Sequence, residues 1–226
     1  MKLHQITIAA LLASGLAAAH ADTLSYSSST LPVDYTDWIS AAQLQKFDPA
    51  LGTLQHVTLE LFADLSGRAK TENRGTPTTI TLNLQATLAL ADPNNLSNIL
   101  VQTTPLVTRT FQAPVTDAVL DYGGTSGVSY SNLGTSTSRQ ASFTDAATLG
   151  LFTGTGVVAL PFSAVGESNA TGSGNYRWGF ITMAGGHATV TYDYLPSAVP
   201  EPETWALMLA GLGAVGILAS RRRRGC

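Results

Sequence analysis

Residues 79–90 alternate between apolar and polar side chains, and this alternation constrains the fold more than any other feature. The even-numbered positions form one apolar series: Ile80, Leu82, Leu84, Ala86, Leu88 and Leu90. Successive side chains of a β-strand point to opposite faces, so this period of two predicts a strand with one face in a core. We therefore expect these apolar side chains to be buried together.

Two other segments carry the same period less regularly. One consists of Val57, Leu59, Leu61 and Ala63, and the other of Ala188, Val190, Tyr192 and Tyr194. Gly185-Gly186 precedes the second segment, and residues 176–182 precede the glycines. Because two strands joined by a glycine turn form a hairpin, we expect a terminal hairpin here.

Turn-forming residues separate these segments. They are Asp48-Pro49, Gly75-Thr76-Pro77, Asp92-Pro93-Asn94-Asn95, Gly123-Gly124 and Gly172-Ser173-Gly174. Residues 22–199 show no extended apolar period of 3.6, and only residues 145–151 favour a short helical turn. Many short strands without alternating helices predict a mainly β chain, in which residues 22–197 form an antiparallel β-sandwich or jelly-roll-like domain.

Charged residues are sparse, at 12% of the 226 residues, compared with about 25% in typical soluble domains. Residues 22–199 contain seven Lys and Arg and thirteen Asp and Glu, which gives a net charge of −6. Nucleic-acid-binding domains are usually basic, so we expect no nucleic-acid partner. The only cysteine is Cys226, which excludes an intrachain disulfide and a metal site built from several cysteines.

The first 21 residues have the three parts of a secretory signal peptide. Lys2 supplies the positive charge, residues 6–18 are predominantly apolar, and Ala19-His20-Ala21 is a small-residue cleavage site. We therefore expect residues 1–21 to form a signal helix that is cleaved after Ala21, with Ala19 and Ala21 defining the site. The remaining chain would be exported across the cytoplasmic membrane.

Residues 198–226 have the pattern of a membrane anchor. Residues 204–220 are uncharged and are followed directly by four arginines. At about 1.5 Å per residue this run spans roughly 25 Å, just enough for a thin hydrocarbon core. We predict one transmembrane helix over 204–220 and a basic tail over 221–226 that stays cytoplasmic. The anchoring residues are Trp205, at the headgroup interface, and Arg221, Arg222, Arg223 and Arg224.

Pro200-Glu201-Pro202, one apolar span and a terminal arginine cluster follow one another in an order that resembles the PEP-CTERM sorting signal. The resemblance covers about residues 198–226. It implies an exported protein of a Gram-negative bacterium that is processed near Pro200, Glu201 and Pro202 by an exosortase, a membrane transpeptidase-like sorting enzyme. The helix would then be a transient anchor, and the final location of the protein would be the cell surface or the extracellular space.

The segment from Phe47 to Leu54 carries a second resemblance. Its residues predict a core aromatic, an Asp-Pro turn, a glycine at positive φ and a resuming strand. Together with Trp38 and the closing Tyr192-Asp193-Tyr194, the segment is similar to choice-of-anchor E domains. That resemblance covers about residues 24–195 and implies an extracellular β domain upstream of an anchoring tail, with no particular chemistry.

No catalytic or metal-binding motif stands out. His56 and His187 are the only histidines of residues 22–199, and both occupy positions that favour the surface. His56 and Glu60 on one strand face would lie about 13 Å apart, too far to share a metal ion. We expect no catalytic residue, no metal site and no cofactor, with a loop calcium ion left open. A secreted hydrolase is the least favoured alternative, because its carboxylate pair cannot be chosen from sequence.

Exposed aromatic rings are candidate contacts for sugars. Tyr122, in Asp121-Tyr122-Gly123-Gly124, lies beside a glycine loop and is the strongest candidate. The PEP-CTERM resemblance implies a role in an exopolysaccharide matrix or biofilm. We therefore expect a structural or adhesive, non-enzymatic protein with exopolysaccharide as a candidate partner. The alternative is a carbohydrate-binding module that contacts glycans through Tyr122.

Overall fold

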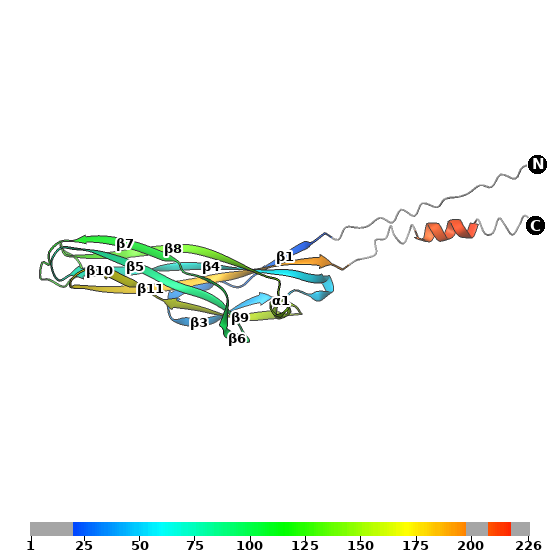
Figure 1. The fold of residues 1–226 in the computed structure, drawn as a ribbon, viewed down its shortest axis with the longest axis horizontal. Coiled ribbons are helices and arrows are strands. Elements are labelled where there is room, and N and C mark those ends of the chain that lie inside the picture. Colours follow the sequence, from blue (N-terminus) through cyan, green and yellow to red (C-terminus); the bar gives the residue numbers. More distant parts are fainter. Residues whose placement is uncertain (1–19, 198–207, 218–226) are drawn as a thin grey trace, which may run out of the picture.

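The computed structural model describes residues 20–197 and 208–217, and 68% of these residues lie in strands. The named strands pair antiparallel, and the longest of them run along the long axis of the domain (Figure 1). In chain order the elements are β1 (Asp22–Ser27), β2 (Leu31–Tyr35), β3 (Trp38–Gln45), η1 (Pro49–Leu51), β4 (Gly52–Asn73), β5 (Thr78–Asp92), β6 (Asn95–Thr103), β7 (Leu106–Ala113), β8 (Gly127–Phe143), α1 (Ala146–Phe152), β9 (Val157–Gly166), β10 (Asn169–Gly172) and β11 (Tyr176–Pro196).

The strands form two sheets. The first has the order β1-β11-β4-β8, and β2 pairs with β11 farther along the edge that β1 occupies. The second has the order β10-β5-β9-β3, and β6 and β7 also pair with β5. This arrangement confirms the predicted mainly β, antiparallel fold and is consistent with a β-sandwich.

The inward faces of β4 and β5 line the core. On β5, the predicted apolar series is buried, with no member more than 1% exposed: Ile80, Leu82, Leu84, Ala86, Leu88 and Leu90. On β4, the inward positions that begin at Val57 are buried in the same way, and both sets belong to one hydrophobic cluster. The period-two pattern therefore predicted the buried face correctly.

An aromatic group packs at the α1 end of this core. The ring of Phe47 is fully buried and lies 5.8 Å from the ring of Tyr192 and 5.0 Å from that of Tyr194, measured between centroids. Phe152 of α1 lies 6.3 Å from Tyr192 on the same measure. The hydroxyl of Tyr192 donates a 2.7 Å hydrogen bond to the carbonyl oxygen of Gln45. Tyr192 therefore joins the first sheet to the chain that leaves β3.

The predicted terminal hairpin is wrong, because β11 runs without a turn from Tyr176 to Pro196. Gly185 and Gly186 lie inside this strand, between β4 on one side and β2 on the other. A Cβ atom at Gly186 would lie 2.1 Å from the carbonyl oxygen of Phe62. The glycines therefore permit close approach of neighbouring backbones, which is a second common use of glycine within strands.

Two short helical segments each begin after an aspartate that caps the helix. Asp48 caps η1 by accepting a hydrogen bond from the amide of Ala50, after which Gly52 begins β4. Asp145 caps α1 by accepting a 2.9 Å hydrogen bond from the amide of Thr148. The short helix expected over residues 145–151 is therefore observed at Ala146–Phe152.

The first and last strands of the domain meet at one end. Asp22 of β1 pairs with Tyr194 of β11, and Gly52 at the start of β4 pairs with Pro196. The other end, which we call the distal end, carries the β4–β5 connection and β10 (Figure 1). Since β4 has 22 residues, at about 3.3 Å per residue the two ends are roughly 70 Å apart.

Most of the two predicted targeting segments lies outside the described residues. These include residues 1–19 of the signal peptide and Trp205 with Arg221–Arg224 of the anchor. Residues 208–217, inside the predicted span 204–220, form a helix. Among the residues that the structure describes, no helix reaches the length and apolar character needed to cross a membrane. The signal helix and the transmembrane helix stay predictions.

Shortening Leu82 tests the packing of the two sheets. Leu82→Ala leaves a cavity in the fully packed core and is expected to lower the free energy of unfolding by about 2–5 kcal/mol. Thr81→Ala, one residue away on the opposite face of β5, is the control and is expected to cost less than about 1 kcal/mol. Denaturant unfolding of both variants measures the difference. Equal losses would contradict the assignment of the two faces.

Tyr192 predicts a specific loss of stability at high pH. Burial, and to a lesser extent Tyr26, raises the pKa of the Tyr192 hydroxyl above its usual value. The unfolded chain therefore releases this proton first, so stability is fully present below about pH 10 and falls as pH rises further. Tyr192→Phe should lose about 0.5–1.5 kcal/mol at pH 8 through the missing hydrogen bond.

The same variant should also lose less stability than the wild-type protein between pH 8 and pH 11. Tyr35→Phe is the control, because Tyr35 is 66% exposed. Denaturant unfolding at both pH values gives the comparison. Identical pH dependence in wild-type protein and Tyr192→Phe would show that Tyr192 titrates alike in the folded and unfolded chain.

Candidate functional site

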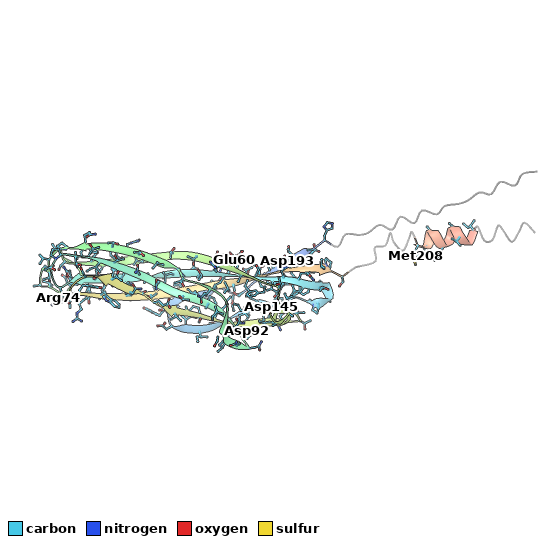
Figure 2. All side chains as sticks on the ribbon, viewed as in Figure 1. Glu60, Arg74, Asp92, Asp145, Asp193 and Met208 are labelled. Carbon is cyan, nitrogen blue, oxygen red and sulfur yellow. The ribbon has the colours of Figure 1, made fainter. Side chains whose placement is uncertain are left out.

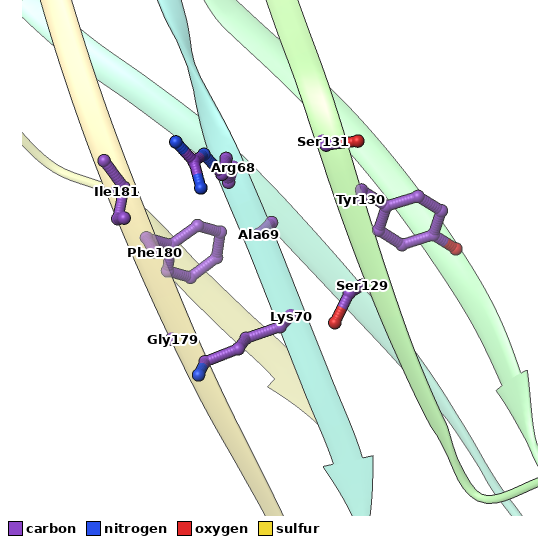
Figure 3. A pocket seen from close by; sticks show the side chains of 9 residues that line it. All are labelled: Arg68, Ala69, Lys70, Ser129, Tyr130, Ser131, Gly179, Phe180 and Ile181. Carbon is purple, nitrogen blue, oxygen red and sulfur yellow. The ribbon is translucent and has the colours of Figure 1, made fainter. Parts of the chain in front are cut away.

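A depression on the first sheet, toward the distal end, is the strongest candidate site. It has a volume of ≈ 560 Å³ and lies over three neighbouring strands, β4, β8 and β11 (Figure 3). Each strand contributes three consecutive residues to its lining, and none of the nine is acidic: Arg68, Ala69, Lys70, Ser129, Tyr130, Ser131, Gly179, Phe180 and Ile181.

The strand register decides which of these side chains face solvent. Lys70 of β4 pairs with Gly179 of β11 and with Ser129 of β8, so these three positions share the outer face. Their neighbours Ala69, Phe180 and Tyr130 also pair across the strands, and they pack against the core.

Gly179 leaves room on the outer face, and the Lys70 side chain occupies it. A Cβ atom at this position would lie 3.3 Å from Cε of Lys70, so the Lys70 stem passes directly over the glycine. Arg68 pairs with Ile181 two residues along, and both side chains are exposed. The Lys70 stem over Gly179 therefore forms part of the floor of the depression, and Arg68 and Ile181 lie beside it.

A β-bulge shapes the β8 side of the depression. Gly67 pairs with Leu133 and Ala69 with Tyr130, so two residues of β8, Ser131 and Asn132, oppose Arg68 alone. Asn132 has a φ of 56°, a left-handed conformation that asparagine tolerates better than most residues. Bulges of this kind re-aim side chains at the edges of sheets and near binding sites.

The structure places Tyr122 beside the depression. The Nζ atom of Lys70 lies 4.0 Å from the centroid of the Tyr122 ring, a cation–π contact. The Ser129 hydroxyl donates a 2.9 Å hydrogen bond to the Tyr122 carbonyl oxygen. Tyr122 is half-buried and has a φ of 56°, an unusual conformation for a bulky residue. Its role as a glycan contact stays a prediction.

The loop that carries Tyr122 packs on a buried glutamate and is hydrogen-bonded to it. Glu72 of β4 has no exposed surface, and its Oε1 atom accepts a 2.6 Å hydrogen bond from the Ser126 hydroxyl. Its Oε2 atom has no hydrogen-bond partner among the described residues. A Cβ atom at Gly127 would lie 2.1 Å from this Oε2 and 2.5 Å from the Gly123 amide nitrogen, so the loop packs tightly.

Two aspartates brace the same loop by accepting backbone hydrogen bonds. Asp117 accepts from the amide of Val119, and Asp121 accepts from the amide of Gly123. The bond from Val119, followed by contact with the Ser126 side chain, holds the pKa of Asp117 below its usual value. Both carboxylates therefore stabilise the loop that presents Tyr122.

The two histidines lie away from the depression. His187 stacks on Phe62, with ring centroids 4.5 Å apart and an interplanar angle of 6°. His56 pairs in register with Asp193 and is exposed. Among residues 20–197 and 208–217, no group of three or more His, Cys, Asp and Glu side chains is placed to hold a metal ion.

Of the residues at this site, Tyr122 was predictable from the sequence, whereas Arg68, Lys70 and Gly179 were not. These residues lie on strands far apart in the sequence, and only the register brings them together. The candidate sorting residues Pro200, Glu201 and Pro202, and Ala19 of the signal cleavage site, lie outside the described residues, whereas Ala21 is exposed just before β1.

Adding one methyl group at Gly127 tests the packing of the loop. Gly127→Ala would clash with the Glu72 carboxylate and the Gly123 backbone, so we expect a loss of about 1–3 kcal/mol in unfolding free energy. Amide hydrogen exchange of residues 116–126 should become faster. Gly150→Ala is the control, since nothing lies within 4 Å of a Cβ there. A Gly127→Ala protein with unchanged stability and exchange would contradict this packing.

Comparison with known proteins gives one specific match. No curated protein matches the chain. Among solved structures, similar chains come from infectious bursal disease virus: the Gx strain, 10% identical with a TM-score of 0.18 over 92% of this chain and 49% of that chain, and the Gt strain, 11% identical with a TM-score of 0.17 over 97% and 53%. The chain thus spans about half the length of these viral chains. Similarity at such TM-scores does not establish a shared fold or function.

The specific match is at the C-terminal end of the chain. Residues 198–224 match the PEP-CTERM protein-sorting motif. This motif implies export and membrane-associated sorting by an exosortase in Gram-negative bacteria. The chain is therefore similar, over residues 198–224, to proteins that are exported and sorted through this motif.

Proposed function

We propose that this protein is a non-enzymatic structural or adhesive component of the cell surface or of an exopolysaccharide matrix or biofilm. The sorting motif at residues 198–224 carries the proposal, because it implies delivery outside the cytoplasm. The long sheets support it, since they hold the start of β1 and the end of β11 together and project the distal end away from them.

The outer face of the first sheet supports a role in a hydrated, sugar-rich environment. Four hydroxyl side chains lie in register across four neighbouring strands: Ser25, Thr191, Thr58 and Ser142. Two hydrogen bonds join this row, at 2.7 Å between Ser25 and Thr191 and at 2.9 Å between Thr58 and Ser142. Such a face offers donors and acceptors to water and to sugar hydroxyls.

In the proposed topology, the β domain lies outside the cytoplasmic membrane and Arg221–Arg224 lie inside. A helix over 204–220 anchors the chain transiently, after the signal peptide of residues 1–21 has been removed at Ala19-His20-Ala21. Pro200-Glu201-Pro202 then lies at the outer interface, where its prolines favour an extended chain that a membrane enzyme can bind. Processing there releases the domain to the surface or the medium.

The β domain itself is proposed to be of the choice-of-anchor E type. Two parts of that resemblance, Phe47 and the closing tyrosines, pack together, which supports it. Phe47 contacts both Tyr192 and Tyr194, whereas Trp38 packs on Phe162, with ring centroids 5.4 Å apart. Residues from the two ends of the proposed domain thus share one core.

A carbohydrate-binding module is the second candidate function, and the depression beside Tyr122 favours it. An aromatic ring, two cations and two serine hydroxyls gather there. A hydrolase is less favoured, because the same lining contains no carboxylate for the acid–base pair of glycoside hydrolysis.

Replacing the sorting motif separates anchoring from processing. In a host with the matching exosortase, replacement of Pro200, Glu201 and Pro202 by alanine should leave the chain in the membrane fraction, uncleaved, while most of the wild-type protein is released. Glu203→Gln, next to the Pro200-Glu201-Pro202 triplet, is the control and should be processed normally. Fractionation followed by immunoblotting measures both the location and the size of each variant.

Neutralising the arginines should have a different effect. Each arginine at a membrane centre costs about 2.5–3.5 kcal/mol on the insertion scale, so four together stop the helix from passing through. Replacing Arg221–Arg224 by glutamine should weaken membrane retention, whereas replacement by lysine should preserve it. Normal release of the triple-alanine variant would refute the sorting proposal.

A further inference from the structure

We propose that the depression formed by β4, β8 and β11 binds an acidic polysaccharide through the carboxylates of its uronic-acid units. The inference rests on the proposed surface or matrix role and names a ligand class for it. It starts from two unpaired cations and an aromatic ring that lie together in a domain of opposite net charge.

The basic residues of the domain gather at its distal end. Residues 22–199 carry a net charge of −6, yet four of their seven basic residues lie on the last part of β4, just after it, or on the facing part of β11: Arg68, Lys70, Arg74 and Arg177. Figure 2 shows Arg74 at the end of the domain opposite to Asp145 and Asp193. Glu72, Asp117 and Asp121 also lie at this end, but the four cations outnumber them, whereas acidic residues outnumber basic ones in the rest of the domain. A polyanion is therefore repelled least at the distal end.

The cations of the depression are free to bind a ligand. Arg68 and Lys70 are exposed, and neither forms an ion pair with a carboxylate among the residues that the structure describes. Lys70 is nevertheless held in place, because its Nζ atom lies over the Tyr122 ring. A guanidinium group binds a carboxylate through two parallel hydrogen bonds, and an ammonium group adds a point charge.

The remaining lining matches the other parts of a sugar. The side chain of Ile181 is 37% exposed and offers an apolar wall to the carbon-bound hydrogens of a pyranose ring. Ser129 and Ser131 offer hydroxyls on the opposite side of β4 (Figure 3). The volume of ≈ 560 Å³ lies within the range of about 300–1,000 Å³ that is usual for ligand sites.

Backbone strain also concentrates around this depression. The described residues include four non-glycine positions with positive φ, and three of them border the depression or belong to its loop: Ala118, Tyr122 and Asn132. Residues in such conformations cluster at ligand-binding sites, where the surrounding structure holds them for function. Tyr122 and Asn132 lie on the loop and strand that flank Lys70 and Arg68.

Duplex DNA is the competing polyanion, and the structure favours the polysaccharide. DNA-binding proteins that rely on phosphate contacts typically make about 6–10 of them, whereas this depression contains two cations within an acidic domain. The serine hydroxyls and the apolar side chain of Ile181 suit a narrow sugar chain. Binding to DNA is therefore a test outcome that opposes the proposal.

The experiment measures binding of the purified full-length protein in detergent to three polymers. These are polygalacturonate, neutral dextran and duplex DNA, compared at physiological ionic strength by biolayer interferometry. Polygalacturonate should bind, dextran should show no measurable binding, and DNA should bind at least ten-fold more weakly than polygalacturonate.

Two double variants with the same change in net charge locate the site. Arg68→Ala with Lys70→Ala should weaken polygalacturonate binding by about ten-fold or more, since charge-assisted bonds are lost. Arg109→Ala with Arg139→Ala removes two cations outside the depression and should change binding by less than about two-fold. Thermal unfolding of each variant confirms that it is folded.

Tyr122→Gly gives an independent readout. Glycine adopts positive φ without strain, which offsets part of the packing lost with the half-buried ring, so the protein should stay folded, whereas polygalacturonate binding should fall several-fold because Lys70 loses its cation–π contact. The proposal is overturned by equal losses in the two double variants, by DNA binding as tight as polygalacturonate binding, or by no polygalacturonate binding. Each of these results leaves the sorting proposal intact, because that depends on residues 198–224.

Discussion

The inward face of β4 is the constraint on which the rest of the structure depends. This strand pairs with β11 from Gly52 to Asn73 and with β8 over most of its length. Its inward side chains, such as Leu59 and Leu61, are fully buried against the core that β5 also lines. A one-residue shift of β4 would move all of these leucines to solvent, at about 1.5–3 kcal/mol for each side chain. The register of the first sheet is therefore strongly determined.

That register also builds the outer face. Once the inward leucines are fixed, Lys70, Gly179 and Ser129 must lie side by side, and Arg68 must lie beside Ile181. The edge of the depression is then shaped by the β-bulge at Ser131 and Asn132 and by Tyr122, which has a positive φ. The same hydrogen-bond ladder thus sets the inward leucines against the core and places the cations together at the distal end.

Local patterns predicted what local interactions determine. The alternation over residues 79–90 predicted β5 and its buried face, and Asp145 marked the start of α1, because period and capping act within a few residues. Gly185-Gly186 led to the wrong prediction of a hairpin, because two consecutive glycines favour a turn when only the local sequence is considered. Pairing with β4 and β2 kept the strand continuous.

Of the residues at and beside the depression, only Tyr122 could be predicted, because the glycines that follow it mark a loop in the sequence. Arg68 and Gly179 are brought together by pairing between strands separated by more than 100 residues, and no short-range pattern encodes such a register. The sorting motif, by contrast, is a linear feature that a partner enzyme recognises. It could therefore be recognised from the sequence alone, and residues 198–224 match it.

The intact mass of the wild-type protein recovered outside the cells tests the central claim, export followed by sorting, most directly. Export followed by sorting predicts a chain that begins at Asp22 and ends near Pro200-Glu201-Pro202, so that the apolar segment and Arg221–Arg224 are missing. Recovery outside the cells of a chain that still carries Arg221–Arg224 would contradict processing at the motif.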